Sequence, residues 1–106
     1  MKSRLHRYLA DSAMDWYLRT QLKSTPEIKI LITVREGCWG TCEQIGSKYK
    51  ITVNPHQSVR DFVATVMHEL THVKQWETGI YQGTGERECK NVEYKLADQA
   101  WTEGAL

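Results

Sequence analysis

The chain has 106 residues, of which 41% are hydrophobic and 25% charged, and this composition and length predict one globular domain covering residues 1–106. Fourteen basic and thirteen acidic residues leave a formal net charge of +1, so the chain lacks the basic excess typical of nucleic-acid-binding proteins. Its apolar runs are three residues long at most, far too short to span a bilayer.

The first residues do not resemble a secretory signal, because Arg, His and Asp interrupt the region where an apolar segment would lie. The three cysteines, Cys38, Cys42 and Cys89, cannot all pair within one chain. An odd number of cysteines without a secretory signal favours free thiols and a reducing compartment. We therefore expect a cytoplasmic protein that binds neither a membrane nor nucleic acid.

Residues 3–22 are predicted to form an amphipathic helix, because apolar side chains recur there with helical spacing. The repeating positions are Leu5, Leu9, Ala13 and Trp16, with Tyr8 and Leu22 near the same stripe. Ser3 is the expected cap of this helix. The proline at position 26 ends the helical region, since the residue before a proline disfavours the helical conformation.

Two strands are predicted next. Residues 27–35 and 48–54 both alternate apolar with polar side chains, which is typical of strands with one buried face. Between them, residues 36–47 contain three glycines and are expected to be a loop or an irregular hairpin. The second strand should stop at the Asn-Pro pair that begins at position 54.

A long helix is predicted from Val59 to about Thr78. Ser58 is its expected N-cap, with Asp61 at the third position after it, and Gly79 is its expected terminator. After a glycine-rich loop over residues 79–85, a last helix should run from about Glu86 to Trp101.

The elements together predict an α+β fold, in which an N-terminal helix and a small β-sheet or hairpin precede the two later helices. We expect the N-terminal helix to pack on the long helix or on the sheet beside it. The predicted core residues are Trp16, Ile30, Ile32, Phe62, Val66, Leu70 and Leu96.

The long helix contains the sequence His-Glu-Leu-Thr-His over residues 68–72, an HExxH motif. Two histidines four positions apart lie about 40° apart around a helix and about 6 Å apart along it, so both rings can bind one ion. Glu69 flanks the same face, where it can take a proton from a water bound to that ion without being a ligand. The motif therefore predicts a Zn²⁺ site with His68 and His72 as ligands and Glu69 as general base.

A catalytic zinc needs a third protein ligand and one open position. The chain does not continue the motif as HExxHxxGxxH, because Gln75 and Thr78 stand where the Gly and the third His would be. A carboxylate of the last helix is the better candidate, and we expect Glu93 to be the third ligand. Glu88, Glu86 and Asp98 remain the alternatives.

An HExxH helix followed by a glutamate-bearing helix resembles the gluzincins, the zinc peptidases with two histidines and one glutamate as ligands. The small size resembles the minigluzincins and similar small metallopeptidases encoded by phages. The resemblance implies a zincin-like fold and a peptide or protein substrate. It also assigns the upper edge of the cleft to the strand at 48–54. Many gluzincins carry Asp or Asn four residues after the ligand glutamate, where this chain has Ala97.

The leading hypothesis is a zinc metallopeptidase that hydrolyses peptide bonds. The alternative is a zinc-binding interaction or adaptor protein whose site is inactive or latent, and retention of Glu69 favours the enzyme because a structural site does not need it. Attack of water on the peptide carbonyl would place a negative charge on its oxygen, and stabilising this oxyanion needs a further hydrogen-bond donor. Tyr81, Tyr94 and His56 are the candidates. Cys38 and Cys42 are interpreted as reduced thiols in a loop.

Overall fold

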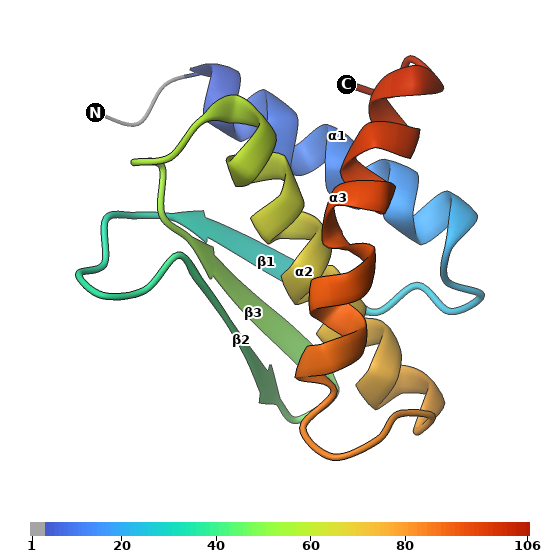
Figure 1. The fold of residues 1–106 in the computed structure, drawn as a ribbon. Helices are drawn as coiled ribbons and strands as arrows, with labels where there is room; N and C mark the ends of the chain where they lie inside the picture. Colours follow the sequence, from blue (N-terminus) through green and yellow to red (C-terminus); the bar gives the residue numbers. More distant parts are fainter. Residues whose placement is uncertain (1–3) are drawn as a thin grey trace.

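The structure, a computed structural model, describes residues 4–106 and has an α+β architecture of three helices and one mixed sheet (Figure 1). Its elements are α1 (Arg4–Thr20), β1 (Glu27–Ile32), β2 (Gly40–Ile45), β3 (Lys48–Val53), α2 (Val59–Thr78) and α3 (Glu86–Thr102). The predicted α+β class is confirmed, while Ser3, the expected cap of α1, lies outside the described residues. No helix within residues 4–106 combines the length and the apolar character needed to cross a membrane.

The sheet has the strand order β1-β3-β2. β1 pairs with β3 in parallel, with Ile30 beside Ile51, whereas β2 runs antiparallel to β3. A two-residue turn that begins at Gly46, whose φ of 63° suits glycine, joins β2 to β3. The hairpin alternative for residues 36–47 is thus confirmed, and β1 is shorter than predicted because the strand ends at Ile32.

The strand order corrects one expectation about the cleft. We expected the strand at 48–54 to form its upper edge, but β3 is the central strand and is paired on both sides. β2 is the edge strand that packs against α2, because the hairpin places it on the side of β3 away from β1.

The helices lie on one face of the sheet, with α2 against it and α1 and α3 against α2 (Figure 1). The opposite face carries charged side chains in rows across the strands. Glu27 lies 3.3 Å from Lys48, and Glu43 lies 3.9 Å from Lys50, measured between the charged atoms. Apolar side chains therefore gather on the helical side of the sheet.

α2 has the bounds predicted from its caps. The Ser58 hydroxyl accepts a hydrogen bond from the backbone N–H of Asp61, and Gly79 ends the helix with a φ of 70°. All seven predicted core residues are buried. α2 runs through the middle of this core, so its position is held from three sides by α1, α3 and the sheet.

The buried stripe of α1 begins later than predicted. Leu9, Ala13 and Trp16 are buried as expected, but Leu5 is half exposed. In the first turn His6 faces α2 instead, with its ring edge-on to Phe62 at 4.9 Å between centroids. The expected packing of α1 on α2 is confirmed.

The end of α2 is tied to the sheet and to the loop after α1 through Glu77. The hydroxyls of Tyr49 and Ser24 both donate hydrogen bonds to its carboxylate, at 2.6 and 2.8 Å. These two bonds lower the pKa of Glu77, because they favour the charged form of the carboxylate.

We predict that Glu77 stabilises the fold at neutral pH but not in acid. A carboxylate whose pKa is lower in the folded chain contributes stability above its unfolded-state pKa, about 4.3, and loses it as the pH falls through the folded value. Urea unfolding should therefore show the parent more stable than Glu77→Gln at pH 7, with the gap closing below about pH 4. A gap that is the same at pH 7 and pH 3 would contradict this role.

Candidate metal centre

α2 places the two motif histidines side by side. His68 and His72 lie one turn apart on the same helix face, with 5.2 Å between ring centroids. Both are buried, at 9% and 8% exposure. They face α3, which packs along α2 and carries the glutamates expected to complete the site (Figure 1).

Glu86, the first residue of α3, reaches both imidazoles. One of its carboxylate oxygens, Oε1, lies 3.2 Å from Nε2 of His68 and 2.6 Å from Nε2 of His72. Partial burial by itself raises the pKa of Glu86, but its hydrogen bonds with His72 and His68 outweigh that effect and lower the pKa. A single oxygen of Glu86 therefore contacts both Nε2 of His68 and Nε2 of His72.

Glu93, the third ligand expected from the sequence, lies beside the same site but on the other side of one ring. Its Oε2 is 3.4 Å from Nδ1 of His68. Glu88 instead accepts a hydrogen bond from the Gln75 amide, and Asp98 pairs with Arg60. Glu86 and Glu93 are thus the two carboxylates of α3 that contact the imidazoles, and which of them binds a metal stays a prediction.

Gln75 is a supporting residue that the sequence analysis did not identify. Its amide nitrogen donates to the backbone oxygen of Gly85 at 3.0 Å and to Oε1 of Glu88 at 2.8 Å. Its amide oxygen is therefore the atom that faces Nδ1 of His72, at 3.1 Å. Its position three residues after His72, on the same helix face, was the available signal.

These contacts leave the imidazoles short of protons. If His72 donates its Nδ1 proton to Gln75, Nε2 can donate to the Glu86 oxygen only when the ring carries a second proton. His68 has a carboxylate oxygen at each nitrogen, and a neutral ring can donate to only one. The contact between Nε2 of His72 and Glu86 therefore needs a positive charge between the two atoms, either an added proton or a metal ion.

The Glu69 side chain points toward β2, whereas the two imidazoles contact Glu86 of α3. The side chain of Glu69 is 6% exposed, and a Cβ placed on Gly40 of β2 would lie 3.0 Å from its Oε2, so the carboxylate sits against the edge strand. Burial first, and then the negative charges of Glu86 and Glu93, raise its pKa to about 8. A cation at the imidazoles would oppose these effects and favour the charged carboxylate.

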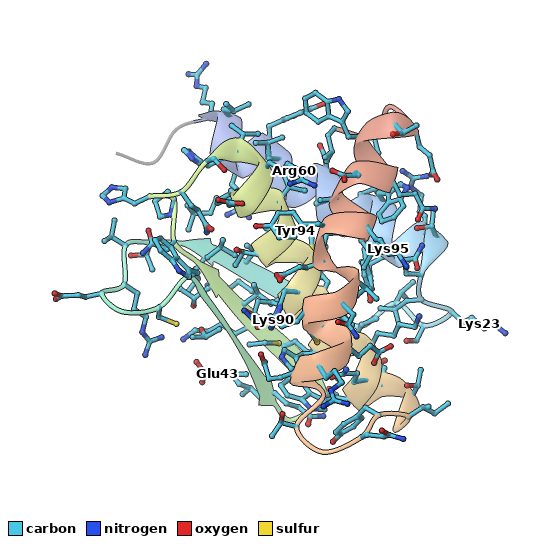
Figure 2. All side chains as sticks on the ribbon, in the orientation of Figure 1. Lys23, Glu43, Arg60, Lys90, Tyr94 and Lys95 are labelled. Carbon is cyan, nitrogen blue, oxygen red and sulfur yellow. The ribbon has the colours of Figure 1, made fainter. Side chains whose placement is uncertain are left out.

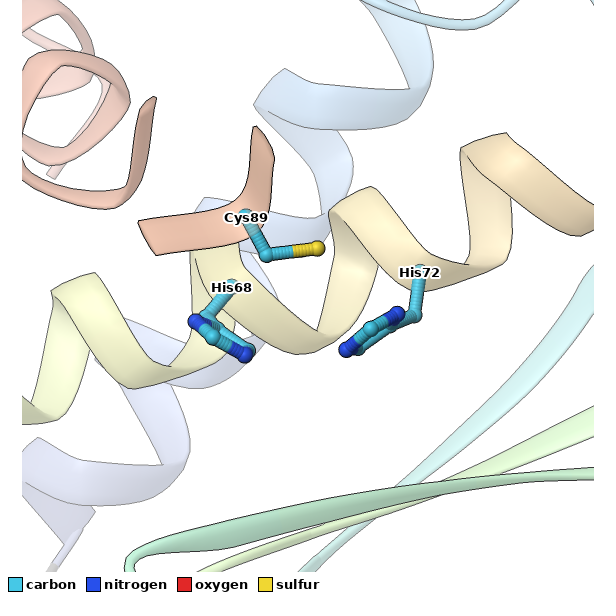
Figure 3. Close-up of side chains that lie close together, drawn as sticks. All are labelled: His68, His72 and Cys89. Carbon is cyan, nitrogen blue, oxygen red and sulfur yellow. The ribbon is translucent and has the colours of Figure 1, made fainter. Parts of the chain in front are cut away.

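Cys89 is a further donor at the site. It is fully buried on α3, one turn after Glu86. Its sulfur and one nitrogen from each of His68 and His72 all lie within 4.8 Å of one another (Figure 3). These three residues form a buried group that can hold a metal ion. The sequence contained a signal for it, since Cys89 shares a helix face with Glu86 and Glu93.

The other two cysteines do not belong to this group. The Cys38 thiol donates to the backbone oxygen of Gly40 at 3.2 Å, in the turn that precedes β2. Burial is the main cause that raises the pKa of the Cys42 thiol to about 12. All three cysteines are free, as expected.

A pocket of about 510 Å³ opens between α3 and the start of β2, and side chains of the site lie along its wall. The residues that line it include Trp39, Gly40, Thr65, His68, Glu69, Glu86, Lys90, Glu93 and Tyr94. Of the three donors expected for an oxyanion, only Tyr94 lies among them, whereas His56 lines a separate hollow. Lys90 and Tyr94 project from α3 toward this space (Figure 2).

No protein-family model matches the chain, and neither a curated protein nor a solved structure matches it. Its function therefore has to be inferred from the chemistry of the residues described above.

The turn before α3 offers a test of how His72 is supported. Gly83 and Gly85 both have positive φ, 57° and 80°. A Cβ on Gly83 would meet nothing within 4 Å, whereas one on Gly85 would lie 2.6 Å from Cδ of Gln75. The two positions are therefore a matched pair, in which only Gly85 touches the residue that supports His72.

We predict that Gly83→Ala costs about 1–2 kcal/mol of unfolding free energy, the strain of a left-handed non-glycine residue. Gly85→Ala should cost a further 1–3 kcal/mol, roughly the penalty for leaving the buried Gln75 amide without its partners. Urea unfolding of both variants measures the difference. Equal losses would show that Gln75 is not held by this turn.

Proposed function

We propose that the chain is a zinc-dependent metallopeptidase in which a metal-activated water attacks the peptide bond and Glu69 is the general base. The observation that carries this proposal is the placement of one Glu86 oxygen between Nε2 of His68 and Nε2 of His72. Two imidazole lone pairs and a carboxylate oxygen directed at one point are the ligands that catalytic zinc sites use. The HExxH motif and the resemblance to the gluzincins support the same assignment.

The charge of the site also favours a divalent cation. Glu86 and Glu93 contact the two imidazoles and Glu69 lies close to both glutamates, while Glu69 and Glu93 are largely shielded from water. Gathering negative charge in such a place is unfavourable unless a cation accompanies it. Nitrogen and oxygen ligands in a set of this kind suit Zn²⁺.

Glu86 is the better placed of the two carboxylates that contact the imidazoles. Coordination through Nε2 of both histidines puts Glu86 in the third ligand position, because its oxygen already touches both nitrogens. Glu93 then accepts the Nδ1 proton of His68, and Gln75 accepts that of His72. Such partners fix the orientation of ligand histidines and increase their basicity. In this proposal the sequence-based assignment of Glu93 gives way to Glu86.

Zinc bound here would supply its usual chemistry, lowering the pKa of a water ligand to about 7. Glu69 lines the pocket, so its carboxylate could take the proton of such a water and deliver it to the leaving amine. Lys90 and Tyr94 line the same pocket, and Lys90 is the candidate donor for the negative charge that develops on the substrate carbonyl, because the Tyr94 hydroxyl already donates to Asp61.

The substrate proposed for this pocket is an extended peptide. β2 is an edge strand, and Gly40 at its start lines the pocket beside Glu69. An edge strand offers unpaired backbone groups, to which a peptide can add as a further strand. The role of cleft edge, first expected at 48–54, is therefore proposed for β2.

The adaptor alternative retains one specific observation in its favour. Cys89 lies within 4.8 Å of one nitrogen of each motif histidine, so together with Glu86 it could supply a fourth protein donor. Four protein ligands leave no open position, which is the arrangement of structural zinc sites. In that case the metal would hold α3 on α2 and perform no reaction.

We predict that Glu69→Gln keeps the metal and loses the activity. The amide preserves the shape of the side chain but cannot accept the proton, so peptide cleavage should fall by about 10²–10⁴-fold. Zinc content by elemental analysis and cleavage of a mixed peptide pool are the two measurements. Loss of zinc from Glu69→Gln, or cleavage at the parental rate, would contradict the assigned role.

The third ligand can be assigned by comparing two variants of α3. Glu93→Gln should weaken zinc binding by about 10–100-fold, the usual effect of losing a partner of a ligand histidine. Glu86→Gln should weaken it further, since an amide is a poorer zinc ligand than a carboxylate. Asp98→Asn is the control, because Asp98 pairs with Arg60 away from the imidazoles. The reverse order of the two glutamate variants would return the ligand role to Glu93.

A further inference from the structure

The Cys89 thiol is a buried donor that the proposed reaction does not use. It lies on the face of α3 that also carries Glu86 and Glu93, and none of its surface is exposed. Within residues 4–106 its sulfur makes no hydrogen bond, although it lies within 4.8 Å of a nitrogen of each motif histidine. The group directed at the imidazoles is thus a free thiol (Figure 3).

Zinc takes four ligands in most protein sites, and His68, His72 and Glu86 supply three. Thiolate sulfur is a strong zinc ligand, with bonds of about 2.3 Å against about 2.0–2.1 Å for imidazole nitrogen. Donors around one ion are then about 3.5 Å apart. Separations of at most 4.8 Å require a movement of no more than roughly 1 Å, within reach of a side-chain rotation at Cys89. No other thiol belongs to this cluster among the described residues.

We propose that Cys89 is an exchangeable fourth ligand, which closes the zinc site in a resting state and leaves it when the site becomes active. This inference rests on the proposed peptidase function and adds its regulation. On opening, the sulfur–zinc bond would break, the Cys89 thiolate would take a proton from solvent to become a thiol, and a water molecule would occupy the released position. No oxidation or reduction takes place.

The surroundings of the site favour exchange over permanent closure. Cys89 approaches the imidazoles from α3, whereas Glu69 lies against Gly40 of β2 and lines the pocket, to which Cys89 does not contribute. A permanently closed site would give the Glu69 carboxylate, which lines the pocket, no water to act on. An open position on the pocket side is where its carboxylate could act on a water.

The experiment uses Co²⁺ in place of zinc, because a thiolate bound to Co²⁺ gives a near-ultraviolet charge-transfer band that imidazole and carboxylate ligands do not. We expect the full-length parent to show this band with one Co²⁺ bound. Cys89→Ala and Cys89→Ser should lose the band while still binding the ion through the other ligands. Cys42→Ala is the matched control, since it removes another free thiol, from β2, and should keep the band.

The same variants, loaded with zinc, test the exchange. Cys89→Ala and Cys89→Ser should cleave a mixed peptide pool on the order of 10- to 1,000-fold faster per bound zinc than the parent, since an open minor state is commonly about 0.1–10% populated. The serine variant keeps the size of the side chain, so it covers the case in which alanine disturbs the fold.

The possible outcomes separate this inference from the proposed function. Co²⁺ bound at the histidines of the parent without the band would overturn the role of Cys89. The band together with no gain in rate, while the parent cleaves peptides, would overturn the exchange. The band in the parent with no cleavage by any variant would overturn both the exchange and the peptidase, and would leave a structural site with Cys89 as a ligand.

Discussion

The packing of α3 along α2 is the contact on which the candidate site depends. α2 carries two imidazoles that have no carboxylate partners of their own on that helix face, and α3 supplies both Glu86 and Glu93. Small residues allow the close approach, because Ala97 and Ala100 are buried at the interface. The apolar contacts that hold the helices together therefore also set the distances within the polar site. A substitution in the core would change the distances between the carboxylates of α3 and the imidazoles of α2.

Much of the polar site is secured by backbone features at its ends. The turn before α3 lets Gln75 donate to the backbone of Gly85, and the same amide reaches His72. At the other side, Gly40 allows β2 to come close to Thr65 and Glu69. Two glycines thus determine how closely the neighbouring chain approaches the charged residues. Neither glycine takes part in the chemistry, yet the positions of His72 and Glu69 depend on them.

The sequence was most informative where local chemistry decides the outcome. The bounds of α2 were predictable because a serine cap and a left-handed glycine act within one turn of the helix ends. The HExxH spacing likewise determines that His68 and His72 share a face. β2 was harder to identify, since it lies among glycines and its residues do not alternate between buried and exposed.

Features that arise from tertiary packing were not predictable in the same way. The central position of β3 depends on which strands pair, and the strand's own pattern contains no information about that choice. The roles of Glu86, Glu93 and Cys89 depend on how α3 is rotated and shifted along α2. The sequence of either helix alone does not determine this packing geometry. Gln75 was overlooked because a buried glutamine is indistinguishable in sequence from an exposed one.

The charged side chains on the uncovered face of the sheet affect whether two copies of the chain can pair through their strands. A three-stranded sheet covered on one side only leaves two edges exposed, and such edges are templates for pairing between copies. The individual pairs, Glu27 with Lys48 and Glu43 with Lys50, are exposed and contribute little to stability. A foreign strand that docks beside β2 meets the carboxylate of Glu43, so a strand that places a like charge opposite this residue is disfavoured. The chain can therefore keep a free strand edge beside its pocket while discouraging self-association there.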